Sequence, residues 1–195
     1  MTTEKLARIS PAERRRGFLT GLGKITLSVT TIALLTGNEK LALARSASAQ
    51  TTNNDVTILN TALALEHEAI AAYQVGAESG LLQKPVLALA VQFQGDHKQH
   101  TDALEKAIKK LGGMPVTPRT DYDFPKNKLK TQTDVLAFAA TLEKGAASAY
   151  LGTIPILTER DLARRLASIL GDEAMHWAIL RQALGQNPVP EAFIS

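Results

Sequence analysis

Residues 171–176 read GDEAMH, and residues 95–100 read GDHKQH in the same register. Each segment carries two metal-binding side-chain types at positions i and i+3, which are Glu173 with His176 and His97 with His100. Side chains three residues apart share one face of a helix, so each pair can reach a single site. The offset of 76 residues between the two segments indicates an internal repeat.

Each half of this repeat also contains an earlier glutamate. Glu66 is followed seven residues later by Tyr73, and Glu143 is followed seven residues later by Tyr150. Seven residues advance a helix by about two turns, so the glutamate and the tyrosine of each pair share one face. We predict that both tyrosines lie in the core, with a redox or hydrogen-bonding role as the alternative. The chain is therefore predicted to form two helical hairpins, each with a glutamate on its first helix and an i,i+3 pair on its second.

The spacing of apolar residues predicts an all-α fold of four packed helices. The expected helices cover residues 54–79, 85–112, 133–157 and 159–184, and residues 114–132, which contain three prolines, form a long connection. Asn53, Asn54 and Asp55 are candidate N-caps of the first helix. A kink is expected at Pro155 in the third helix.

Charged and imidazole groups interrupt the apolar face of all four predicted helices at mid-length. An ionised carboxylate in a dry bundle centre is costly unless it is paired or bound to a cation, and no Lys or Arg lies on these faces. A divalent metal would supply the missing positive charge; carboxylates with imidazoles suit iron or manganese, with zinc possible. A buried polar network is the alternative. The predicted metal ligands are Glu66, His97, His100, Glu143, Glu173 and His176.

Asp96 and Asp172 precede two of these candidate ligands by one position. They either form hydrogen bonds to metal ligands or are charges on the flank of the helix.

Composition excludes several classes of protein. The 195 residues include no cysteine, which excludes disulfides, iron–sulfur clusters and thiolate zinc sites. The net charge of +3 comes from the N-terminus, because residues 50–195 carry 14 basic and 16 acidic side chains. We therefore expect no binding to nucleic acid.

Residues 1–49 are predicted to be an export signal. A basic segment at Arg14–Arg16 precedes a short apolar run over 25–35, and Ala47-Ser48-Ala49 forms a small-residue cleavage motif before Gln50. The apolar run is too short and too polar to span a bilayer. A basic amphipathic tail is the alternative.

Residues 15–19, RRGFL, resemble the twin-arginine export motif. The resemblance implies the twin-arginine export machinery as a partner and cleavage after about Ala49. It also implies a mature domain of residues 50–195 in the periplasm or otherwise outside the cytoplasm, without stable membrane insertion.

Residues 55–195 resemble the ferritin-like di-metal carboxylate superfamily, whose members place a Glu on each of two helices and Glu-x-x-His on each of the other two. More narrowly, the chain resembles exported bacterial ferritin-like domain proteins related to plant desiccation proteins. The segments that carry this narrower resemblance are Leu142-Glu143, Tyr150-Leu151-Gly152, Glu173–His176 and Pro188–Phe193. The resemblance implies a ferritin-like four-helix bundle with one long crossover between helices 2 and 3, and it allows a homo-oligomer.

The same resemblance implies a site for two metal ions. Glu66 and Glu143 would be terminal ligands, Glu173 a bridging ligand, and His100 and His176 the imidazole ligands. His97 departs from the pattern, because a second bridging glutamate is expected at its position. With three carboxylates in place of four, we expect weaker binding of the second ion.

Three functions are compatible with this sequence. The first is a metal-dependent oxidoreductase acting on oxygen or peroxide, of the ferroxidase or peroxide-removing type. The second is a metal-binding protein without turnover, which the histidine at position 97 favours. The third is a stress-protective helical bundle in which the site is structural.

Overall fold

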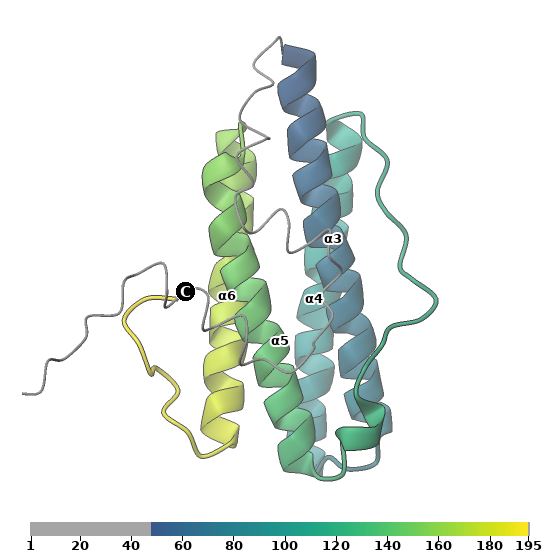
Figure 1. Ribbon diagram of the computed structural model, residues 1–195, viewed down its shortest axis with the longest axis vertical. Coiled ribbons are helices and arrows are strands. Elements are labelled where there is room, and N and C mark those ends of the chain that lie inside the picture. The colour runs from purple at the N-terminus through teal and green to yellow at the C-terminus, as the bar shows by residue number, and fades with distance from the viewer. Residues whose placement is uncertain (1–47, 195) are drawn as a thin grey trace, which may run out of the picture.

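The computed structural model describes the backbone of residues 48–194 and the side chains of residues 54–194. Four helices lie side by side (Figure 1): α3 (Ser48–Glu78), α4 (Lys84–Lys110), α5 (Gln132–Thr153) and α6 (Arg160–Ala183). Two 3₁₀ turns, η2 (Lys126–Lys128) and η3 (Ile154–Ile156), precede and follow α5. The described residues contain no strand, so the predicted all-α bundle is confirmed.

None of the helices in the described part of the chain has the length and apolarity needed to cross a membrane. The predicted export signal lies outside the described residues, except for Ser48 and Ala49 at the start of α3.

The bundle consists of two antiparallel hairpins, as the repeat predicts. α3 packs mainly against α4, and α5 packs mainly against α6. The connection from α4 to α5 runs along the outside of the bundle from one end to the other, on the right of Figure 1. This is the predicted crossover between the second and third helices of the bundle.

The start of the crossover is held against α3. The Asn60 side chain donates from Nδ2 to the Met114 carbonyl (3.0 Å) and accepts from the Val116 N–H at Oδ1 (2.8 Å). A Cβ at Gly113 would lie 2.6 Å from Cγ1 of Val56, so the close approach of the crossover to α3 requires glycine at this position.

Two predicted helix boundaries were wrong. α3 begins at Ser48, so Asn53, Asn54 and Asp55 lie inside the helix and do not cap its N-terminus. α5 ends at Thr153 and does not continue through a kink at Pro155. Pro155 has no N–H with which to continue the helical hydrogen bonds, although Ile154 before it keeps helical backbone angles, so the chain forms η3 there before α6 begins.

Asp55 binds the start of a different helix. Its Oδ1 accepts from the Thr158 N–H at 3.0 Å and its Oδ2 accepts from the Glu159 N–H at 3.2 Å. Glu159 is the N-cap of α6 and makes no side-chain cap of its own. The fully buried Asp55 carboxylate therefore joins the first helix to the fourth and places a negative charge at the positive end of α6.

The apolar core is divided into two clusters, one towards each end of the bundle. Both contain a tyrosine from the repeat, which confirms that the two tyrosines are core residues. The first cluster comprises Leu59, Ala62, Leu63, Leu104, Ile108, Tyr150, Leu162, Leu166 and Ile169. The second comprises Tyr73, Phe93, Leu136, Ala140 and Leu180.

Replacing Asp55 with alanine should lower the free energy of unfolding of the metal-free protein by about 2–3 kcal/mol, because two N–H groups before α6 lose a charged acceptor. Chemical denaturation followed by circular dichroism measures this change. Asp102→Ala on the exposed side of α4 is the matched control and should change stability by less than about 0.5 kcal/mol. Equal effects of the two substitutions would contradict the role assigned to Asp55.

Candidate metal centre

The structure brings all six predicted ligands together at one level of the bundle. Each of the four helices contributes, with one glutamate each from α3 and α5 and an i,i+3 pair each from α4 and α6. Five of the six side chains are buried, and the sixth, His100, is 13% exposed. The six residues are Glu66, His97, His100, Glu143, Glu173 and His176.

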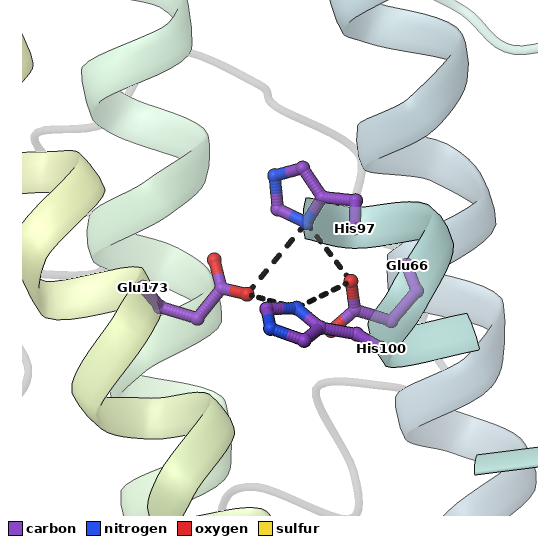
Figure 2. Close-up of side chains that lie close together, drawn as sticks. All are labelled: Glu66, His97, His100 and Glu173. Atoms are coloured by element: carbon purple, nitrogen blue, oxygen red, sulfur yellow. Dashed lines mark hydrogen bonds and ion pairs between the residues drawn. The ribbon is translucent and has the colours of Figure 1, made fainter. Parts of the chain in front are cut away.

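His97 lies at the centre of the group, between three glutamates. Its Nδ1 is 2.9 Å from Oε2 of Glu66 and 3.6 Å from Oε1 of Glu173. Its Nε2 is 3.3 Å from Oε1 of Glu143. Figure 2 shows His97 and the three residues on one side of it. There His100 Nδ1 lies 3.1 Å from Oε1 of Glu173 and 3.4 Å from Oε2 of Glu66.

The ligand atoms form two overlapping groups of four. Within each group the ligand atoms lie within 4.8 Å of one another. His97 and Glu173 belong to both groups. Glu66 and His100 complete the first group, and Glu143 and His176 complete the second. Two neighbouring cation positions that share Glu173 and His97 are therefore compatible with the geometry.

Two aspartates contact His100 and His176, the two outer histidines, at the ring nitrogen that faces away from the centre of the group. Oδ2 of Asp172 lies 3.2 Å from Nε2 of His100, and Oδ2 of Asp96 lies 3.4 Å from Nε2 of His176. In both histidines this leaves Nδ1 facing the centre of the bundle. Each aspartate supports the histidine of the other hairpin, so Asp96 and Asp172 are partners of the candidate ligands and not only charges on the flank.

Two tyrosines donate hydrogen bonds to the glutamates, which bears out the alternative role, but the sequence did not predict their partners. The Tyr73 hydroxyl donates to Oε1 of Glu143, and the Tyr150 hydroxyl donates to Oε1 of Glu66. The repeated seven-residue spacing from glutamate to tyrosine indicated a shared helix face. It could not reveal that each tyrosine binds the glutamate of the other hairpin, because that pairing depends on the distance between α3 and α5.

The surroundings of these side chains raise the pKa values of some of them and lower the pKa values of others. Burial alone would lower the pKa of His97, but its bonds to Glu143 and Glu66 outweigh burial and raise the pKa to about 10. Burial, followed by the neighbouring Glu143 carboxylate, raises the pKa of Glu173. Burial also opposes ionisation of Glu66, yet the adjacent His100 and His97 lower its pKa overall.

Protons can therefore neutralise the group when no metal is bound. A cationic His97 between Glu66 and Glu143, with a neutral Glu173 beside them, removes most of the buried negative charge. The absence of Lys and Arg from the predicted apolar faces indicated a metal as the source of this positive charge. The raised pKa values of His97 and His100 make these histidines a second source of positive charge.

The group also fits a metal. Within the described residues, five buried ligand atoms lack a well-formed hydrogen bond. Buried polar atoms are rarely left without partners, so these atoms are suited to binding a cation. Carboxylate oxygens and imidazole nitrogens suit iron, manganese or zinc. The five atoms are His100 Nδ1, His176 Nδ1, Glu143 Oε2, and both carboxylate oxygens of Glu173.

A family model described as a ferritin-like domain matches residues 54–186, which is most of the chain. The chain belongs to the ferritin-like family. A comparison with curated proteins gives no match.

Solved structures similar to this ferritin-like chain share its fold at low sequence identity. A conserved hypothetical protein from Mycobacterium tuberculosis has a TM-score of 0.63 at 22% identity, covering 75% of this chain and 99% of that one. The bacterioferritin of Desulfovibrio desulfuricans, described with a diiron site, has a TM-score of 0.65 at 20% identity, covering 72% and 83%. Ferritin-like diiron-carboxylate proteins from Bacillus anthracis have a TM-score of 0.60 at 22% identity, covering 69% and 97%.

Metal binding to this ferritin-like site should release protons, because His97 and Glu173 hold protons at neutral pH and a ligand must lose them. Below the raised pKa values of both groups, loss of their two protons increases the apparent affinity about hundredfold per pH unit, and the raised pKa of His100 steepens this dependence wherever its ring is protonated. Chelator competition between pH 6 and pH 8, corrected for the chelator's own protons, measures this slope.

His97→Gln is the internal control for this pH dependence. It should reduce the slope by about one proton. An affinity that does not change over this pH range would contradict the assigned protonation.

Proposed function

We propose that this ferritin-like protein binds two divalent ions, iron or manganese, and acts as a metal-dependent oxidoreductase on dioxygen or peroxide. The observation that supports the proposal is the pair of overlapping ligand groups that share His97 and Glu173. Two divalent ions, once bound, would supply one electron each, which suffices to reduce dioxygen to peroxide or peroxide to water. The diiron sites named for two of the similar structures are consistent with this function.

The residues of the chain have distinct tasks in this proposal. Glu66 with His100, and Glu143 with His176, would each hold one ion from the outside. Glu173 would bridge the two ions, since both of its oxygens are buried without a well-formed hydrogen bond in the described structure. Asp172 and Asp96 would orient the two outer histidines through Nε2.

The tyrosines would hold Glu66 and Glu143 in place by hydrogen bonds to one oxygen of each carboxylate. Each hydroxyl donates to one glutamate oxygen, so that carboxylate keeps its other oxygen for a metal. Burial, followed by the adjacent carboxylates, raises the pKa of both Tyr73 and Tyr150, so the hydroxyls keep their protons near neutral pH. The apolar clusters on both sides of the site limit the access of bulk water.

A metal-binding role without turnover is a second candidate function. The observation that favours it is His97, whose two ring nitrogens contact carboxylates on both sides of the group. A neutral imidazole at this shared position supplies no negative charge, whereas a bridging glutamate would supply one. The site therefore has less charge with which to hold two oxidised ions, and a single ion or redox-inactive zinc would fit it better.

We propose that the protein acts outside the cytoplasm. The proposal is supported by the order of the N-terminal residues, with Arg15 and Arg16 ahead of a weakly apolar run and a small-residue motif before Gln50. The predicted relation to exported desiccation-related proteins agrees with that location. The same predicted relation favours a third candidate function, a stress-protective helical bundle in which the site is structural. A homo-oligomer stays a prediction.

Glu173→Gln should remove most of the bound metal and abolish consumption of dioxygen or peroxide, because the shared carboxylate is lost while its volume is kept. Elemental analysis of protein purified without chelator measures the metal content, and an oxygen electrode or a peroxide assay measures consumption. Glu105→Gln, at the surface pair with Lys109, is the matched control and should change neither. Unchanged metal content in Glu173→Gln would contradict the assignment.

His97→Glu should raise the metal content towards two ions per chain, because a fourth carboxylate restores the charge that two divalent ions require. Titration with iron(II) or manganese(II) under anaerobic conditions measures the stoichiometry. Gln92→Glu on α4 is a suitable control, because Gln92 is exposed and is absent from both ligand groups. Equal stoichiometry in wild type and His97→Glu would show that position 97 does not contribute to metal binding.

A further inference from the structure

A small apolar cavity lies in the bundle next to the candidate metal centre. Its volume is about 30 Å³, and all four helices contribute to its wall. A cavity needs about 10–15 Å³ of such space to hold a water, so this one has room for a molecule of two or three heavy atoms. It reaches from Leu82 in the turn between α3 and α4 inwards to Phe93.

The lining of this cavity does not suit a polar molecule. All the lining side chains are apolar except Tyr73, and the Tyr73 hydroxyl donates to Glu143 in the metal centre. A polar molecule such as hydrogen peroxide would lose its hydrogen bonds on entry, at a cost of about 2–7 kcal/mol for each unpaired group. Cavities of this kind stay dry and take up non-polar guests such as xenon.

Two aromatic side chains separate the cavity from the ligands. Phe93 lines the cavity, and its ring stacks on the His176 imidazole with ring centroids 3.9 Å apart. Tyr73 lines the cavity as well, and its ring centroid lies 5.3 Å from that of His97. Phe93 and Tyr73 therefore each line the cavity on one side and contact a candidate ligand on the other.

The polar access to the same ligands lies elsewhere. Asp96 and Asp172 are each 28% exposed and contact the outer histidines. Neither aspartate lines the cavity. The partly exposed charged groups beside the outer histidines, on α4 and α6, are thus separate from the apolar lining of the cavity.

We propose that the apolar cavity binds a non-polar diatomic molecule, dioxygen, and delivers it to the metal centre past Tyr73 and Phe93. This inference rests on the proposed function, and it assigns dioxygen, not peroxide, as the oxidant that uses this route. Half-buried side chains, including Leu82 and Val86, form the outer part of the lining near the end of the bundle.

Xenon binding to the metal-free full-length protein tests the cavity without any redox reaction. Crystals under xenon pressure should show one xenon among Ala72, Ala90 and Phe93. Ala90→Leu, which fills the cavity, should reduce xenon occupancy at least fivefold, whereas Ala88→Leu on the exposed side of the same helix should leave it unchanged. Absence of xenon from the wild-type cavity would overturn the proposal.

Oxidation of the iron(II)-loaded protein by the two oxidants tests delivery. Ala90→Leu should slow oxidation by dioxygen at least tenfold and oxidation by peroxide less than twofold, and Ala88→Leu should slow neither. Equal slowing of both reactions by Ala90→Leu, or slowing of neither, would overturn the delivery route. Ala72→Val fills the same cavity from α3 and replaces Ala90→Leu if that variant does not fold.

The two proposals fail in different ways. Wild-type protein that binds xenon but reacts with neither oxidant would contradict the proposed function and support the cavity as a site for non-polar molecules. Wild-type protein that reacts with dioxygen but binds no xenon would contradict the cavity and support the proposed function.

Discussion

Three buried carboxylates share one level of this bundle, and neutralising their charge is the constraint on which the rest of the structure depends. Ionised glutamates inside an apolar core cost several kcal/mol each unless positive charge lies beside them. His97, between Glu66 and Glu143, can supply that charge by holding a proton, and a divalent cation can supply it instead. The same side chains thus serve the metal-free and the metal-bound protein, which links folding, protonation and metal binding at a single site.

Supporting contacts of the site connect one hairpin to the other, although Asp172 also lies 3.5 Å from His176 on its own helix. Tyr150 binds Glu66 and Asp172 contacts His100, while Tyr73 and Asp96 form the matching contacts in the opposite direction. Neither hairpin holds a complete set of ligands with their supporting partners. The site is therefore also the interface that joins the two hairpins, together with Asp55, which connects α3 to the start of α6.

Much of the site could be predicted from residue spacing, since the i,i+3 pairs and the repeated glutamates place six ligand types on helix faces that must meet in a bundle. The N-terminus of α3 and the role of Asp55 could not, because a capping residue type near a predicted helix start does not reveal which helix it contacts. The end of α5 was also missed, since Pro155 can either kink a helix or end it, and packing decides between the two.

The sequence by itself determined the four helices, their apolar faces and the identity of the six candidate ligands, because these depend on the helical period within each segment. Only the tertiary structure decided that His97 lies between the glutamates, that each tyrosine crosses to the other hairpin, and that an apolar cavity adjoins the ligands. Those features depend on the rotation and axial position of each helix relative to its neighbours. Close packing of side chains from segments far apart in the chain sets both quantities.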